Sequence, residues 1–150
     1  MTFLLDANVL LRMAEPTHAQ YDAAFDAVAA LTSRGHDLFI VPQNLYEFWA
    51  VATRPVPDNG LGMTPDEAAA ELVAIRARFP LLPDTSAILP EWERLVVAHQ
   101  VRGKPTHDAR LVAAMLAHGV GHLLTFNIKD FKRFPGITAH APADVAAGPP

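Results

Sequence analysis

Acidic or amide side chains interrupt four strongly apolar stretches of this chain. They are Asp6 after TFLL, Glu47 within LYEFWAVA, Asp108 before ARLVAAML, and Asn127 after HLLTF, with Asp130 three residues later. A carboxylate beside buried sequence is costly unless a counter-charge or hydrogen-bond donors compensate it. Carboxylates that cluster also raise one another's pKa, so they remain anionic mainly around a cation. The chain has no cysteine, and oxygen ligands alone favour Mg²⁺ or Mn²⁺ over zinc.

Each of these residues taken alone also has a structural interpretation. Asp108 stands at the start of an expected helix, where an acid is favoured by about 0.3 to 1 kcal/mol. Glu47 would suit an ion pair with Arg54, and Asp6 or Asn127 would suit a turn. The four segments together favour a shared site instead, because the expected fold brings them to one edge of a sheet.

Strand and helix patterns alternate along the chain. Continuous apolar runs predict buried strands at 2–6, 37–41 and 122–126. Helical spacing and end signals predict a helical stretch after Asp6 and helices at 17–35, 43–53, 64–79, 90–100 and 107–119. This alternation favours a parallel sheet with helices on both faces. Ligands bind at the carboxyl edge of such a sheet, where Asp6 and Asn127 are expected.

The remaining segments are expected to be loops or tail. The chain has 150 residues, which suits one domain with a substantial core. Residues 54–63 are dense in proline and glycine and predict a surface loop. The segment 134–142 is expected to be frayed. We therefore expect one domain over residues 1–142 and a disordered tail over 143–150.

The charge balance limits how this protein would meet nucleic acid. A net charge of -4 argues against coating nucleic acid with bulk positive charge, but it does not exclude local contact. Basic residues gather late in the chain, and Arg102, Lys104 and Lys129 are candidates to meet phosphate groups. Alternatively, these basic residues form only a solvated surface and bind no ligand. The lack of cysteine and of a long apolar amino-terminal segment predicts a cytoplasmic protein without a membrane span.

Four motifs resemble those of the PIN-domain nucleases, especially the VapC-type toxins of bacterial toxin-antitoxin pairs. They are LLDANVLL, NLYEFWAVATRP, THDARLVAAML and LLTFNIKDFKRFPGI, and together they extend from about Phe3 to Ile137. The resemblance implies a three-layer α/β/α fold with a central parallel sheet. It also implies an acidic cluster that holds Mg²⁺ or Mn²⁺ and hydrolyses RNA, a cognate antitoxin as partner, and a homodimer.

Carried over residue by residue, the resemblance implies metal ligands at Asp6, Glu47 and Asp108. Asn8 matches the polar residue that supports the first acid, and we group it with Arg102, Lys104 and Lys129 on the substrate-binding side. Many family members have Asp where this chain has Asn127, with Asp130 following. An amide coordinates through oxygen but adds no charge, so a second metal position is in doubt more than the first.

These observations predict a metal-dependent endoribonuclease that uses water as nucleophile and leaves 5'-phosphate and 3'-hydroxyl ends. The main alternative is a PIN-like module that binds RNA or protein after losing activity at the fourth acidic position. A receiver domain would need an acceptor Asp at the end of a middle strand, and DLFIVPQN has none there. A phosphatase of the haloacid-dehalogenase type would need an Asp where Asn8 stands.

Overall fold

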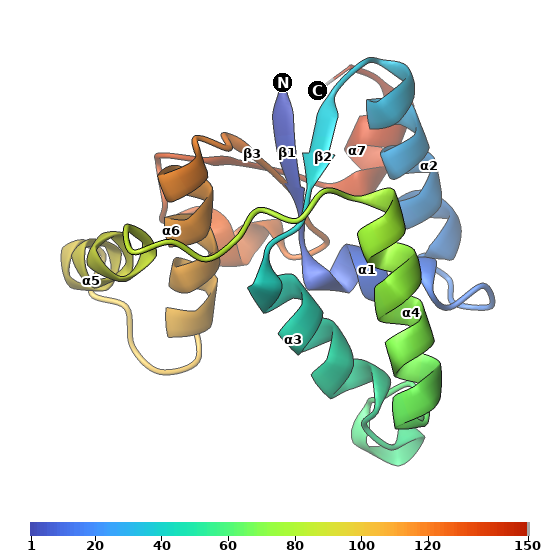
Figure 1. Cartoon of the computed structure of the whole chain (residues 1–150). Coiled ribbons are helices and arrows are strands. Elements are labelled where there is room, and N and C mark those ends of the chain that lie inside the picture. The colour runs from blue at the N-terminus through green and yellow to red at the C-terminus, as the bar shows by residue number, and fades with distance from the viewer. Residues whose placement is uncertain (150) are drawn as a thin grey trace.

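The computed structural model describes residues 1–149, over which strands and helices alternate (Figure 1). The strands are β1 (Thr2–Leu5), β2 (Asp37–Phe39), β3 (His122–Leu124) and β4 (Thr138–His140). The α-helices are α1 (Ala7–Met13), α2 (Tyr21–Ser33), α3 (Pro42–Ala52), α4 (Pro65–Arg78), α5 (Ile88–Ala98), α6 (Thr106–His118) and α7 (Pro142–Ala147). Short 3-10 turns form η1 (Val56–Asp58) and η2 (Ile128–Phe131).

The strands form a parallel sheet in the order β2-β1-β3-β4. β1 is central, because Phe3 pairs with Leu38 on one side and with His122 on the other. Its side chains are buried on both faces of the sheet, which explains why TFLL is continuously apolar and does not alternate. Leu5 pairs with Leu124, so the segments that follow β1 and β3 start side by side.

Helices cover both faces of the sheet (Figure 1). One core cluster joins Phe3 and Leu5 of β1 to α1, α2, α3 and α7. The other joins Leu4 of β1 to α5 and α6. This arrangement confirms the predicted three-layer α/β/α fold with a central parallel sheet.

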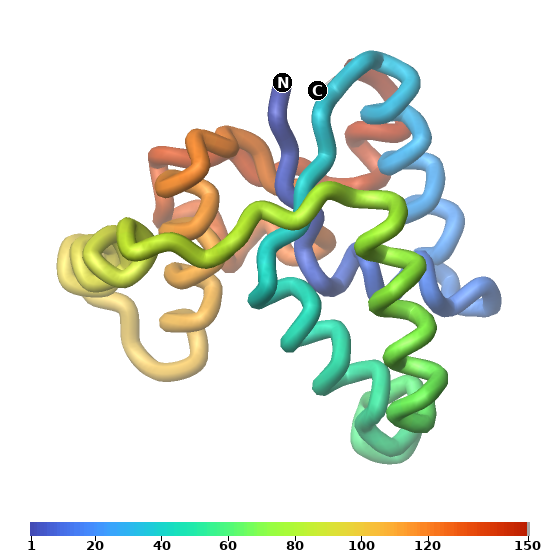
Figure 2. Tube along the Cα trace, viewed as in Figure 1, coloured from blue at the N-terminus to red at the C-terminus, as the bar shows by residue number. Residues whose placement is uncertain are grey.

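The chain between β2 and α5 leaves the sheet and returns to it (Figure 2). It runs outward through α3 and back through α4, and then crosses the carboxyl end of β2 to reach α5. At the crossing, Ile40 forms a parallel bridge with Leu81. α4 begins with a capping box, in which the Thr64 hydroxyl accepts from the N–H of Glu67 at 3.1 Å. Helix starts of this kind were readable from the sequence because they depend on neighbouring residues.

The carboxyl-terminal segment differs from the prediction. Residues 138–140, expected to be frayed, form β4 and pair with β3. Residues 142–147 form α7 instead of a disordered tail, and α7 packs against α2. Val145 is buried, and its carbonyl accepts from Nη1 of Arg34 at 2.8 Å. The prediction of a disordered tail over 143–150 is therefore wrong for residues 143–147, whose order comes from contacts with α2. Residue 150 lies outside the described residues.

Among residues 1–149, no helix has both the length and the apolar character needed to cross a membrane.

The packing of α7 is testable by the substitution Val145→Ala. We expect it to lower the free energy of unfolding by about 2 kcal/mol, because two buried methyl groups are lost. Ala146→Ser at an exposed neighbouring position is the control and should change stability by less than about 0.5 kcal/mol. Urea denaturation measures both. Equal and negligible effects of the two substitutions would show that α7 does not dock on α2.

Candidate active site

Asp6 lies where β1 ends and α1 begins. It is the N-cap of α1, and its Oδ1 accepts from the backbone N–H of Ala7 at 2.7 Å. The hydroxyl of Thr125 donates to its Oδ2 at 2.7 Å. Only 8% of Asp6 is exposed, so these donors take over part of the role of water. The first acid is thereby held at the carboxyl edge of the sheet.

Thr125 connects Asp6 to the turn that follows β3. Its hydroxyl oxygen accepts from Nδ2 of Asn8 at 3.2 Å and from the N–H of Asn127 at 3.0 Å. Oδ1 of Asn8 in turn accepts from the N–H of Phe126 at 3.3 Å. Asn8 therefore supports Asp6 through Thr125. Sequence reasoning missed Thr125, whose one signal is a hydroxyl near the end of the apolar run HLLTF.

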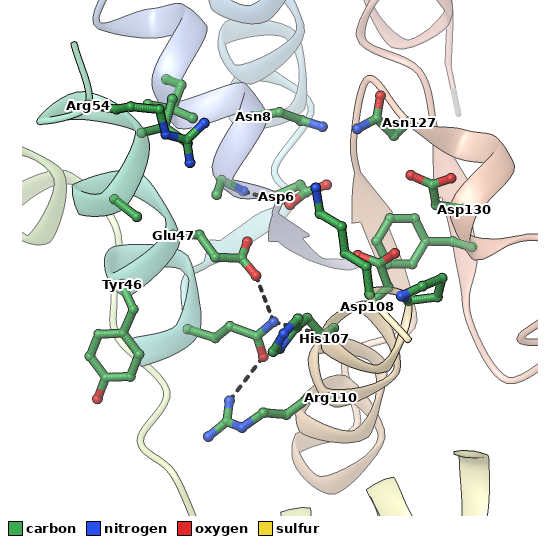
Figure 3. Close-up of a pocket in the computed structure, with 18 residues that line it drawn as sticks. Asp6, Asn8, Tyr46, Glu47, Arg54, His107, Asp108, Arg110, Asn127 and Asp130 are labelled. Carbon is green, nitrogen blue, oxygen red and sulfur yellow. Dashed lines mark hydrogen bonds between the residues drawn. The ribbon is translucent and has the colours of Figure 1, made fainter. Parts of the chain in front are cut away.

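A cavity of about 870 Å³ lies at this edge of the sheet. Side chains from four segments line it, namely Asp6, Glu47 from α3, Asp108 from α6, and Asn127 with Asp130 around η2. Figure 3 shows the carboxylates of Asp6, Glu47 and Asp108 around one space, with Asp130 beside Asp108. The acidic and amide residues that the sequence singled out thus line one cavity, although they come from distant parts of the chain.

Burial and repulsion weaken the acidity of two of these carboxylates. The pKa of Asp6 is raised to about 6, chiefly by burial and also by the charges of Glu47 and Asp108, while the hydrogen bonds from Thr125 and Ala7 oppose the shift. Burial also raises the pKa of Asp108 to about 6, assisted by the charges of Asp130 and Glu47. Paired carboxylates in a buried site behave in this way when no cation balances them.

The donor set suits a hard divalent cation. Carboxylate oxygens predominate among the possible ligands that line the cavity, and Mg²⁺ prefers such oxygens. A nearby cation would also favour the ionised carboxylates and so offset the effects of burial and repulsion that raise the pKa of Asp6 and Asp108. Within residues 1–149, however, no group of three or more His, Asp or Glu side chains is placed to hold an ion as it stands. Binding would require the carboxylates to turn inward or to reach the ion through water.

The predicted basic residues do not all reach the cavity. Lys104 lines it, whereas Arg102 and Lys129 are exposed and lie outside its lining. Arg54 and Arg110 line it as well, and neither was predicted to contact a substrate. In η2, Asp130 lines the cavity while the adjacent Lys129 does not, because neighbouring residues in a turn face different directions.

Glu47 is held by a contact that the sequence did not predict. Its Oε1 accepts from Nε2 of Gln43, one helical turn earlier, at 2.8 Å. The ion pair with Arg54 that the sequence allowed is therefore not the contact that holds this carboxylate. Gln43 is 6% exposed, and its one sequence signal is that it is one of two amides, with Asn44, before the apolar part of this helix.

Comparison with known proteins explains why these segments meet. Residues 3–137 match the family model described as the PIN domain. The chain belongs to the PIN-domain family. Comparison with curated proteins found no match.

Solved structures with the same fold as this PIN domain include toxin-antitoxin proteins. VapBC2 from Rickettsia felis, bound to a promoter DNA fragment, has a TM-score of 0.71 at 16% identity and covers 94% of this chain and 98% of that chain. VapBC-1 from nontypeable Haemophilus influenzae has a TM-score of 0.70 at 15% identity, and the match covers 95% of this chain and 98% of that chain. Mycobacterium tuberculosis VapC20, described as a sarcin-ricin loop cleaving toxin, has a TM-score of 0.62 at 19% identity. This match covers 81% of this chain and 86% of that chain. Identities this low show a shared fold alone.

The raised pKa of Asp6 makes metal-free stability depend on pH. An acid whose folded pKa lies above its unfolded value stabilises the fold below the unfolded pKa, here 3.8, and loses that contribution as the pH rises through about 6. We therefore expect Asp6→Asn to gain stability relative to wild type as the pH rises from about 4 to about 7.5, by roughly 1 to 3 kcal/mol. Urea unfolding in EDTA at several pH values measures the difference. A difference that is constant over this window would show that Asp6 titrates normally.

Proposed function

We propose that this PIN domain is a divalent-metal-dependent endoribonuclease. The observation that carries the proposal is the convergence of Asp6, Glu47, Asp108 and Asp130 on one cavity from four segments of the chain. Two of these acids have a raised pKa, which marks a site where charge is concentrated. A structural role for each acid alone does not account for their gathering.

The acids would divide the work of binding and orientation. Asp6, Glu47 and Asp108 would hold Mg²⁺, and Mn²⁺ would replace it. When bound, the ion supplies Lewis-acid polarisation of the scissile phosphate and neutralises developing charge. Asp6 is held by Ala7 and Thr125. Glu47, held through one oxygen by a neighbouring amide, would orient the attacking water through the other.

Asp130 would serve as the fourth acid in this chain. Asn127, at the position where many family members have Asp, contributes no charge. Asp130 lines the same cavity. Its charge is the second-largest cause of the raised pKa of Asp108, and only burial has a larger effect. Asp130 would therefore supply negative charge for a cation at this edge of the cavity, which the amide of Asn127 does not.

We further propose that the chain is the toxin of a toxin-antitoxin pair, with a cognate antitoxin as its protein partner. The support is the fold shared with the VapBC proteins over nearly their whole length. A homodimer remains a prediction from the family resemblance, and a cytoplasmic location remains a prediction from the sequence composition.

A second candidate is a PIN-like module that binds RNA or protein without cleaving it. Asn127 is the observation that favours this candidate, because the amide lowers the charge available to a second cation. Cleavage by the purified protein separates the two functions, whereas RNA binding alone does not.

The nuclease proposal predicts that RNA cleavage requires both acids and metal. Asp6→Asn and Asp108→Asn should each abolish cleavage in Mg²⁺ or Mn²⁺, because each removes a ligand charge, and both variants should remain folded. Excess EDTA should abolish wild-type cleavage. Products analysed by end labelling should carry 5'-phosphate and 3'-hydroxyl ends, since water is the nucleophile. Cleavage that persists in EDTA, or 2',3'-cyclic phosphate products, would contradict the mechanism.

Lys104 and Lys129 form a matched pair for testing where RNA binds. Lys104→Met should weaken RNA binding and reduce the slope of log K against log salt by about 1, because one phosphate contact is lost. Lys129→Met should change neither the affinity for RNA nor this slope, because Lys129 lies outside the cavity lining. Fluorescence anisotropy in EDTA at several salt concentrations measures both. A larger effect of Lys129→Met would place the RNA on another face.

A further inference from the structure

A buried amide links the second and third acids of the cavity. Gln43 lies in the first turn of α3, and its Nε2 donates to Oε1 of Glu47 at 2.8 Å and to the carbonyl of His107 at 2.8 Å. His107 directly precedes Asp108 in α6. One carboxamide group therefore contacts both the carboxylate of Glu47 and the backbone beside Asp108, across the space between α3 and α6.

Arg110 determines which way this amide points. Its Nη1 donates to Oε1 of Gln43 at 3.0 Å, and its Nη2 pairs with Asp84 at 3.2 Å. A guanidinium group only donates hydrogen bonds, so the amide oxygen faces Arg110 and both amide N–H groups face acceptors. Figure 3 shows this chain of contacts from Arg110 through the amide to Glu47. A reversed amide would place its oxygen against two acceptors and its nitrogen against a donor.

We propose that Gln43 is a positioning residue that holds Glu47 at a set separation from Asp108 for cation binding. The inference rests on the proposed function, because it assigns Gln43 a role at the same site. A simple tie between α3 and α6 would need only the bond to His107, whereas the second N–H orients the acid itself. Hydrogen bonds that orient a metal-binding side chain typically change metal affinity about 10- to 100-fold when lost.

The test measures Mn²⁺ binding in the absence of RNA, by electron paramagnetic resonance of the free ion. Gln43→Met, which is similar in length but has no donor, should weaken Mn²⁺ binding about 10- to 100-fold. In a Glu47→Gln background the same substitution should cause no further loss, because the carboxylate that Gln43 orients is already gone. A residue that only ties the helices together would weaken binding equally in both backgrounds.

RNA cleavage provides a second readout. Gln43→Met should lower kcat and raise the Mn²⁺ concentration needed for half-maximal cleavage, while KM for RNA stays unchanged. This split is expected because Gln43 acts on an acid and not on the substrate backbone.

Two further variants keep the test decisive. Gln20→Met removes an exposed amide that accepts from Arg12 at 3.1 Å and lies outside the cavity lining, so this variant should bind Mn²⁺ as wild type does. Gln43→Asn retains an amide, but its side chain is too short to reach both acceptors, so it should also weaken Mn²⁺ binding. This variant takes the place of Gln43→Met in the test if Gln43→Met does not fold. Urea denaturation checks the folding of each variant.

The outcomes separate failure of this inference from failure of the proposed function. A folded Gln43 variant that binds Mn²⁺ as tightly as wild type, or an equal loss in both backgrounds, would overturn the role of Gln43. A wild-type protein that binds Mn²⁺ but does not cleave RNA would overturn the proposed function, and the Mn²⁺ comparison would still decide the role of Gln43. A wild-type protein that does neither would overturn both.

Discussion

Repulsion among buried carboxylates at the end of one parallel sheet is the constraint to which the rest of the site responds. Asp6 and Asp108 both have a raised pKa, first because they are buried and then because other acids lie close by. Each ionised acid in such a place lowers the stability of the metal-free fold. The cluster therefore does not serve stability, and the contacts around it act to hold the acids in place against their repulsion. This balance is typical of sites where charge is kept for a ligand.

The acids lie on strands and helices that are packed together and cannot easily separate, so their repulsion does not move them apart. β1 is hydrogen-bonded to strands on both sides and buried between two core clusters, so Asp6 at its end has little freedom. α3 packs against α1, and α6 packs against α5 on the other face of the sheet. Glu47 and Asp108 consequently approach the cavity from different layers. Moving one acid away from the others would require repacking a helix against the core, which is costly in a close-packed interior.

Neutral donors hold two of the acids. The Thr125 hydroxyl donates to Asp6, and the Gln43 amide donates to Glu47. Arg110, which lines the same cavity, bonds to the oxygen of that amide and to an acid outside the lining. A direct arginine-carboxylate pair would also stabilise an acid, but it would neutralise the charge that a divalent cation needs. Neutral donors orient the carboxylates and leave that charge in place, which agrees with the proposed metal-dependent chemistry.

Local sequence determined the element types and the candidate acids, because apolar runs, helical spacing and capping signals act over a few neighbouring residues. TFLL and HLLTF predicted the strands whose ends meet at the cavity, and the alternating pattern predicted the parallel sheet. The tertiary structure alone decided that 138–140 and 142–147 are ordered, since β4 depends on β3 and α7 depends on α2. It also decided the roles of Thr125 and Gln43, which contact partners 119 and 64 residues away. Such contacts depend on strand register and helix packing, and neither is encoded in any short stretch of the chain.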